Sequence, residues 1–341
     1  MLGQSGQTTT SFSVHATARR LLMRATVMTP RPHDALFKAA FEAPADAAAL
    51  LRGLLPTPIR AAIGWDTLRR EAGSFVDAAL ADRHNDLLFS AQLRTGGTAP
   101  LFLLLEHQST DDAAMPLRIL SYESQIWHRV LKEHPGARLP PVVAVVISHA
   151  PGGWTASRCF DDMFEPSVLS MPGLAALVPR FALIIEDLAH LTNDDLEARS
   201  LAAFQKLALW LLRDARDPGR LLDSFDVWID AMIQAERAPA GDKAFATLIT
   251  YMFRVIDSVN RGALRAKIRL LGPQAEEHAM TIAEQLHEEG RLATLRSLLA
   301  YKFQTFDARY ESRLEAASPE AIDRYLKRVL VADSLASVFE D

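Results

Sequence analysis

The chain has 341 residues, 49% of them hydrophobic, and a formal net charge of −5. That is enough apolar material for one large or two to three small domains, while the acidic balance and the lack of a basic block argue against strong non-specific DNA binding. The longest apolar runs fall far short of the roughly twenty residues of a membrane span. The single cysteine, Cys159, excludes an internal disulfide and fits a reducing cytoplasm.

Residues 1–27 differ in composition from the rest of the chain. They are rich in Ser, Thr and Gln, and they carry Arg19, Arg20 and Arg24 but no acidic residue. A targeting peptide can have this composition, but no long apolar stretch accompanies it. We expect a disordered extension, with Met28 as an alternative start.

The elements predicted over residues 30–190 alternate between helix and strand. Helices are expected over Pro32–Ala43 and Asp46–Leu55, and from about Pro116 to His134. The predicted strands are Trp65–Arg69, Ser74–Leu80, Asp86–Leu93, Leu101–Gln108, Val142–Ile147 and Phe181–Ile185. The last two read as fully buried strands of a parallel or mixed sheet, so we predict a three-layer α/β domain.

Beyond residue 190 the pattern is helical. Amphipathic spacing predicts the helices Asp194–Arg213, Arg220–Arg237, Lys243–Asn260, Pro273–Phe303 and a last one from Pro319 through Val331. We divide this part into a helical region, 191–270, and a C-terminal region, 271–341. The apolar stripe of Pro273–Phe303 must be buried, either on its own domain or on another copy, and we favour a separable accessory region that mediates self-association.

Polar residues cluster on the two strands that span residues 86–108. Glu106 and Gln108 share one face of a strand because strand side chains alternate, and Asp86 lies on the preceding strand across a Gly96-Gly97 turn. Two carboxylates side by side next to a buried core form a plausible cradle for a hard divalent cation. This is a metal-site hypothesis.

Other candidate residues have competing interpretations. His107 must face away from Glu106 and Gln108, which favours a packed histidine over a metal ligand. His33 and Asp34 begin the first helix, where a cap or a carboxylate favoured by the helix dipole explains them more simply than a catalytic role. Arg118 and Tyr122 lie four apart on one helix face, as a phosphate clamp or as a surface pair.

Several segments resemble the Rpn (YhgA-like) family of recombination-promoting nucleases, also described as transposases. The similar segments run from about His33 to the 300s: PHDALFKAAF, LRREAGSFVD, NDLLFS, LFLLLEHQS, RILSYESQIW, MTIAEQLHEEG and RLATLRSLLAYKF. The family is similar to the PD-(D/E)XK nuclease superfamily. The resemblance implies a mixed-sheet core of that kind flanked by helices, an all-α C-terminal region, and metal-dependent DNA cleavage.

Carried over by position, the motif acid is Asp86 and the spaced pair is Glu106 and Gln108. The resemblance implies a divalent ion, Mg²⁺ foremost with Mn²⁺ or Ca²⁺ as alternatives, held by Asp86, Glu106 and the backbone carbonyl of His107. The superfamily usually has Lys where this chain has Gln108, and a neutral amide can hydrogen-bond but supplies no charge. Glu71 enters the same segment as an outer ligand or as a solvated strand-end carboxylate.

Two function classes follow. The first is a metal-dependent endonuclease that hydrolyses DNA phosphodiester bonds and is linked to recombination or mobile elements, with Gln108 positioning the attacking water. The second is a catalytically weak or inactive DNA- or protein-interaction factor that retains the fold. DNA and a second copy of the chain are the expected partners, in a bacterial-type cytoplasm.

Overall fold

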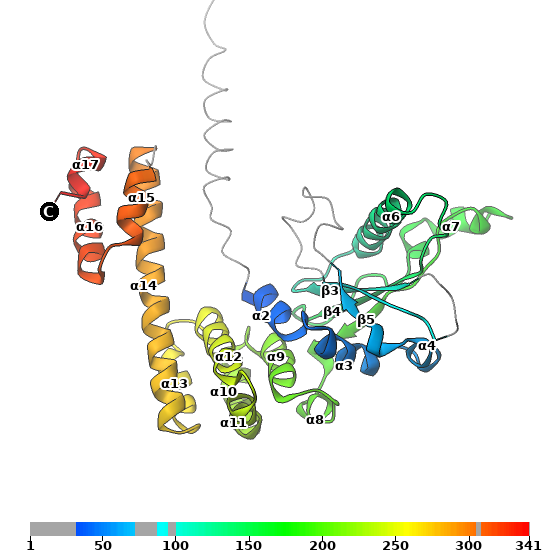
Figure 1. Ribbon diagram of the computed structural model, residues 1–341, viewed down its shortest axis with the longest axis horizontal. Coiled ribbons are helices and arrows are strands. Elements are labelled where there is room, and N and C mark those ends of the chain that lie inside the picture. The colour runs from blue at the N-terminus through cyan, green and yellow to red at the C-terminus, as the bar shows by residue number, and fades with distance from the viewer. Residues whose placement is uncertain (1–31, 72–86, 95–99, 305–307, 341) are drawn as a thin grey trace, which may run out of the picture.

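The computed structural model describes residues 32–71, 87–94, 100–304 and 308–340 (Figure 1). Its sheet has the strand order β1-β2-β3-β4-β5. The strands are β1 (Arg69–Arg70), β2 (Leu87–Ala91), β3 (Leu101–Gln108), β4 (Val142–Ser148) and β5 (Ile184–Asp187). β1, β2 and β3 are antiparallel neighbours, whereas β3, β4 and β5 are parallel. The sheet is therefore mixed and β3 is its central strand, which confirms the predicted α/β class.

Apolar residues cover both faces of this sheet, which explains why all eight residues of β3 are buried. On one face, Leu88, Phe102, Leu104 and Val146 pack in one cluster with the helix α6 (Met115–Glu133). On the other face, the alternate residues of the strands join a larger cluster. That cluster includes the helices α2 (Pro32–Phe41), α3 (Pro44–Leu54), α9 (Ala203–Asp214), α11 (Ile229–Arg237) and α12 (Gly241–Val255).

Shorter elements complete this part of the chain. The remaining helices are α4 (Thr57–Ala62), α7 (Pro166–Leu169), α8 (Asn193–Glu197) and α10 (Pro218–Ser224). Single 3₁₀ turns are η1 (Trp65–Thr67), η3 (Asp161–Met163), η4 (Leu174–Ala176), η5 (Leu188–His190) and η6 (Phe225–Trp228). No helix in the described ranges is both long and apolar enough to cross a membrane.

The C-terminal helices are organised around one long helix, α14 (Pro273–Phe303), which Figure 1 shows running between two groups of helices. Ala275, Ala279 and Ile282 in its first half belong to the large cluster that includes α12. Leu295 and Leu299 in its second half belong to a separate cluster with α16. The other elements are α13 (Arg261–Arg269), α15 (Ala308–Glu315), α16 (Pro319–Val331) and α17 (Leu335–Val338).

Two predicted strands are wrong in their bounds. The segment Trp65–Arg69 begins as a 3₁₀ turn, because the Thr67 hydroxyl and backbone amide both donate to the Gly64 carbonyl, at 2.6 and 2.9 Å. In the segment Phe181–Ile185, pairing with β4 begins only at Ile184. Phe181 and Ala182 instead pair with residues 158–160 of the connection between β4 and β5. The predicted strand Ser74–Leu80 and the Gly96-Gly97 turn lie outside the described residues.

Two predicted helices are interrupted. Asp194–Arg213 is divided into α8 and α9 by a tight turn in which the Leu201 amide donates to the Arg199 carbonyl, at 2.8 Å. Arg220–Arg237 contains the 3₁₀ turn η6, whose Phe225 and Trp228 rings are both buried. The apolar spacing on either side of each break fits a single stripe, so periodicity alone does not reveal it.

Candidate functional site

Glu106 and Gln108 stand at the C-terminal end of β3, on the face that α6 covers. Glu106 is completely buried and Gln108 is 9% exposed. The side-chain amide Nε2 of Gln108 donates to Oε1 of Glu106 at 2.6 Å. The predicted shared face is therefore confirmed, and in this arrangement Gln108 acts as a hydrogen-bond donor to the carboxylate.

Arg118, in the first turn of α6, brings a positive charge to the same carboxylate. Its Nη2 donates to Oε1 of Glu106, and its Nη1 donates to Oδ2 of Asp112 at 2.6 Å. Burial disfavours the charged guanidinium, but attraction to Glu106, Tyr122 and Asp112 outweighs it and raises the pKa of Arg118. The guanidinium is therefore cationic near neutral pH.

Tyr122 lies one helical turn beyond Arg118 but is much more deeply buried. Its side chain is 1% exposed and packs in the cluster between α6 and the sheet, whereas the side chain of Arg118 is 24% exposed. Of the two residues predicted as a phosphate clamp, Arg118 is the one that solvent reaches. The adjacent Glu123 is also buried, and this burial raises its pKa to about 7.

Glu71 approaches the same face of the sheet from β1. Ser90 Oγ donates to Oε1 of Glu71 at 2.5 Å, and Arg69 Nε donates to that oxygen at 3.2 Å. The Glu71 amide donates to the Leu88 carbonyl at 2.8 Å, and Leu88 stands opposite Leu104, two residues before Glu106. The Glu71 carboxylate is thus held on this face at the end of β1, with β2 between it and Glu106 on β3.

Asp86, the first predicted motif acid, lies outside the described residues. β2 begins at Leu87, which stands opposite Leu105. Among the described residues, no group of three His, Cys, Asp or Glu side chains gathers in a way that could hold a metal ion. The carboxylates of Glu106 and Glu71 would offer a metal ion oxygen atoms, which are the ligands that hard divalent cations prefer.

The opposite face of β3 carries a polar cluster around His107. Its Nδ1 lies 2.9 Å from Oδ1 of Asp34, in the first turn of α2. His33 Nδ1 lies 2.7 Å from the hydroxyl of Tyr251. Burial, with the nearby Arg216 and His107 and against the opposing effect of Asp34, lowers the pKa of His33 to about 4. Both α2 residues therefore contact partners far away in the sequence as well as beginning the helix.

His149, which directly follows β4, is the member of this cluster that sequence reasoning missed. It is 4% exposed, and burial, with His107, His33 and Arg216 nearby, lowers its pKa well below the ordinary value. A usable signal exists, because the apolar runs of β3 and β4 both end in polar residues that include a histidine. Parallel neighbouring strands bring such ends to one edge of the sheet.

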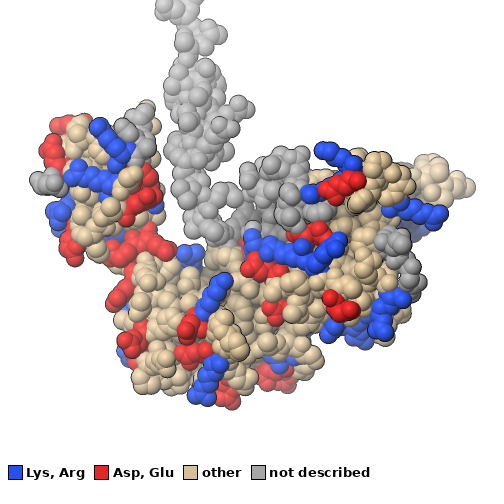
Figure 2. Space-filling model, viewed as in Figure 1, with Lys and Arg blue, Asp and Glu red and all other residues tan. Residues whose placement is uncertain are grey.

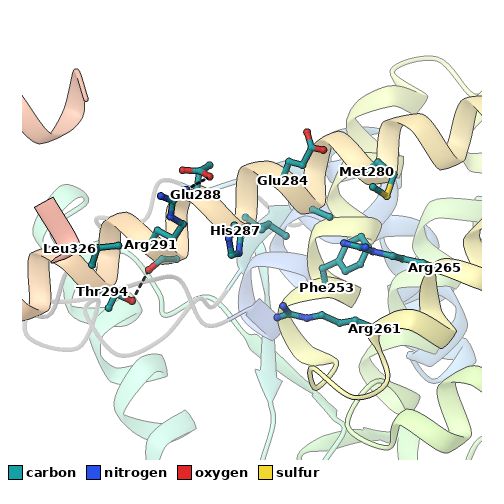
Figure 3. A pocket seen from close by; sticks show the side chains of 13 residues that line it. Phe253, Arg261, Arg265, Met280, Glu284, His287, Glu288, Arg291, Thr294 and Leu326 are labelled. Carbon is teal, nitrogen blue, oxygen red and sulfur yellow. Dashed lines mark hydrogen bonds and ion pairs between the residues drawn. The ribbon is translucent and has the colours of Figure 1, made fainter. Parts of the chain in front are cut away.

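A groove of about 670 Å³ lies elsewhere, between α12, α13, α14 and α16. Figure 3 shows His287 of α14 facing Phe253 and the side chains of Arg261 and Arg265. Glu284 also lines the groove, so its charge is mixed. None of the candidate site residues lines it.

Basic and acidic side chains are mixed on the face of the described residues that Figure 2 shows. With a net charge of −5, the chain lacks the electrostatic footprint of a protein that binds DNA through a large basic surface.

The sequence is similar to several known proteins. Recombination-promoting nuclease RpnD of Escherichia coli O157:H7 is 28% identical over 76% of this chain and 96% of its own length. Recombination-promoting nuclease RpnA of Escherichia coli K12 is 28% identical over 76% of this chain and 84% of its own. The inactive recombination-promoting nuclease-like protein RpnE, also from K12, is 27% identical over 77% and 83%.

No solved structure matches the chain at a significant level. The family described as "Putative transposase, YhgA-like" matches residues 31–241, which include the whole sheet, α6 on one of its faces and α2, α3, α9 and α11 on the other. This match covers more than half of the sequence. The chain therefore belongs to the YhgA-like transposase family.

Proposed function

We propose that the chain is a metal-dependent endonuclease that hydrolyses DNA phosphodiester bonds in recombination or in the movement of mobile elements. The observation that carries the proposal is the fully buried carboxylate of Glu106 at the end of the central strand, with Gln108 and Arg118 donating to one of its oxygens. The names of the relatives RpnD and RpnA support a nuclease role. The PD-(D/E)XK assignment belongs to the same proposal.

The proposed cation ligands are Asp86, Glu106 and the backbone carbonyl of His107, with Mg²⁺ as the preferred ion. The donor chemistry fits, because all three groups present oxygen and Glu106 is shielded from water. Asp86 is assigned because it precedes Leu87, whose partner Leu105 precedes Glu106. When bound, the ion lowers the pKa of a water molecule and neutralises phosphate charge. Glu71 is proposed as an outer ligand.

Arg118 supplies the charge that Gln108 lacks. Its guanidinium is partly open to solvent and already lies against Glu106, so a phosphate entering the site can accept from it. Gln108 holds Glu106 through Nε2, which leaves its amide oxygen able to orient a water molecule. Tyr122 is buried beneath Arg118, so the proposed phosphate contact falls to Arg118 alone.

A second candidate is a factor that retains the fold without efficient cleavage. It is favoured by Gln108 in the place of the superfamily's lysine, and by the contact of Arg118 with Glu106, which a cation would have to share. One relative, RpnE, is itself named inactive. In this alternative the site residues are retained for DNA or protein interaction.

A plasmid-nicking assay separates the two. The purified chain should convert supercoiled DNA to open circles with Mg²⁺ or Mn²⁺ and not with a chelator. Asp86→Ala and Glu106→Gln should lose this activity and bind Mn²⁺ more weakly in calorimetry. Glu277→Gln, an exposed carboxylate on α14, is the matched control and should behave as the parent. A parent that binds DNA but neither binds metal nor nicks would establish the second candidate.

A further inference from the structure

We propose that His107 is a positioning residue for the site on the opposite face of β3, an inference that rests on the proposed nuclease function. The imidazole of His107 is stacked on both sides. The Phe37 ring lies on one side at a centroid distance of 4.8 Å and 17°, and the His149 ring on the other at 4.9 Å and 16°. The plane of the His107 ring is therefore fixed from two elements, α2 and the end of β4.

Asp34 fixes the rotation of the ring within that plane. Its carboxylate can only accept when ionised, so the contact of 2.9 Å assigns a proton to Nδ1 of His107. The position of Asp34 in the first turn of α2 favours the ionised form, because the helix N-terminus carries partial positive charge. Nε2 of His107 has no hydrogen-bond partner among the described residues. Within those residues, the ring is therefore held by a hydrogen bond to Asp34 alone.

The same cluster also reaches Gln108 through the backbone. The His149 amide donates to the Gln108 carbonyl at 3.0 Å, which extends the β3–β4 ladder past the last pair of strand residues, Gln108 and Ser148. His149 thus holds Gln108 by its backbone and stacks on His107 by its ring. The end of β3 is clamped at two consecutive residues.

Because side chains alternate along a strand, a clamp on His107 acts on its neighbours. Any twist of β3 that moves the His107 ring moves Glu106 and Gln108 in the opposite sense. Leu103 and Leu105 fill the same reverse face with purely apolar side chains, which pack without a directional bond. His107, which stands between Glu106 and Gln108, adds a directional hydrogen bond to this apolar packing. The inference is that this bond sets the geometry of Glu106 and Gln108.

Three substitutions separate positioning from simple packing. His107→Phe keeps the stack and loses the bond to Asp34. His107→Asn places an amide donor near Nδ1 and loses most of the stack. Asp34→Asn removes the charge of the acceptor. Ile249→Val, in the same large cluster on α12, is the matched control for a mild loss of stability.

The readouts are kcat and KM for plasmid nicking, the Mn²⁺ Kd from calorimetry, and the thermal midpoint. We expect His107→Phe to unfold near the parent temperature, to lose about ten- to a hundredfold in kcat with little change in KM, and to bind Mn²⁺ more weakly. Asp34→Asn should follow it, His107→Asn should recover part of kcat, and Ile249→Val should keep full kcat.

Equal kcat and Mn²⁺ affinity in His107→Phe and the parent would overturn the positioning role and leave the nuclease proposal intact. Loss of kcat in proportion to loss of stability, with Ile249→Val on the same line, would overturn it as well. A parent that neither nicks nor binds Mn²⁺ would instead sink the proposed function, and the positioning inference with it. The two failures are thus told apart by the parent alone.

Discussion

The guanidinium of Arg118 donates to the buried carboxylate of Glu106 and so joins the first turn of α6 to the end of the central strand. The two residues are twelve positions apart and come from different layers. The contact compensates a charge that has no access to water, and it places a cation at the proposed phosphate site. Its removal should therefore affect both folding and chemistry.

Replacing Arg118 should show both effects. Arg118→Met leaves Glu106 buried without its cation, which costs about 3 kcal/mol of unfolding free energy near neutral pH, as for other broken buried pairs. Arg118→Lys keeps the charge but not the two-pronged geometry, and should fold well while nicking more slowly. Urea unfolding and the nicking assay measure these effects. A fully active and fully stable Arg118→Met protein would show that the contact matters for neither.

Gln108→Lys tests the position at which this chain departs from the superfamily. The ammonium can replace the amide as a donor to Glu106, but it brings a second positive charge next to Arg118. We expect cleavage to persist or rise, with weaker metal affinity because the added charge repels the ion. Nicking rates and Mn²⁺ calorimetry on the same preparation check both. If the variant folds and binds metal yet never cuts, Gln108 has a specific amide role.

The strand that carries the site was predictable, and the reason is local. The apolar run Leu101–Leu105, the following polar residues and the preceding Pro100 fixed the bounds of β3, and alternation placed Glu106 and His107 on opposite faces. The bounds of α14 and α16 followed equally well from Pro at the first turn and regular apolar spacing. In each case residues close together in the sequence determine where the strand or helix begins and ends.

The contacts of the site were not predictable, because they depend on how layers dock. Spacing placed Arg118 and Tyr122 on one face of α6, but only the packing of α6 on the sheet decides that Arg118 reaches Glu106. The cluster behind β3 joins His33, His107 and Tyr251, of which His33 and Tyr251 are 218 positions apart. No period or motif links such residues.

Glu123 predicts how stability depends on pH. Burial raises its folded-state pKa to about 7, above the ordinary value of a glutamate, so the folded state holds a proton that the unfolded state releases. The stability that protonated Glu123 contributes is therefore lost as the pH rises from about 4.5 through 7. Above that range its effect on the free energy of unfolding changes little. Glu123→Gln removes this loss.

The measurement is the thermal midpoint of parent and variant between pH 5 and pH 8. We expect the two to unfold at similar temperatures at pH 5 and the variant to be the more stable at pH 8, because it has no charge to bury. A gap that does not widen with pH would mean that Glu123 is ionised in the folded protein. Glu277→Gln, on an exposed surface, should show no gap at either pH.

The C-terminal helices predict where the chain can be cut. The first half of α14 contributes Ala275, Ala279 and Ile282 to the large cluster, so truncation at 270 exposes apolar surface on the helices it covers. A chain ending at Gly290 keeps these residues and loses only the second cluster around Leu295 and Leu299. This packing differs from the separable region expected from residue 271: the chain ending at Gly290 should be soluble and cooperatively folded, and the chain ending at residue 270 should aggregate.

Self-association is the remaining prediction for this region. Tyr301, Leu330 and Val331 are 82%, 70% and 78% exposed, and Lys302 donates to the Val329 carbonyl, which brings the ends of α14 and α16 together. Three large apolar side chains at one end of the region are a surface that a second copy could cover. Leu330→Glu with Val331→Glu should then shift the sedimenting species to a monomer, as should the chain ending at Gly290. Leu177→Glu, an equally exposed leucine near α7, should leave the assembly unchanged. A parent that is monomeric at high concentration would end the association role and leave the nuclease core as the whole of the proposal.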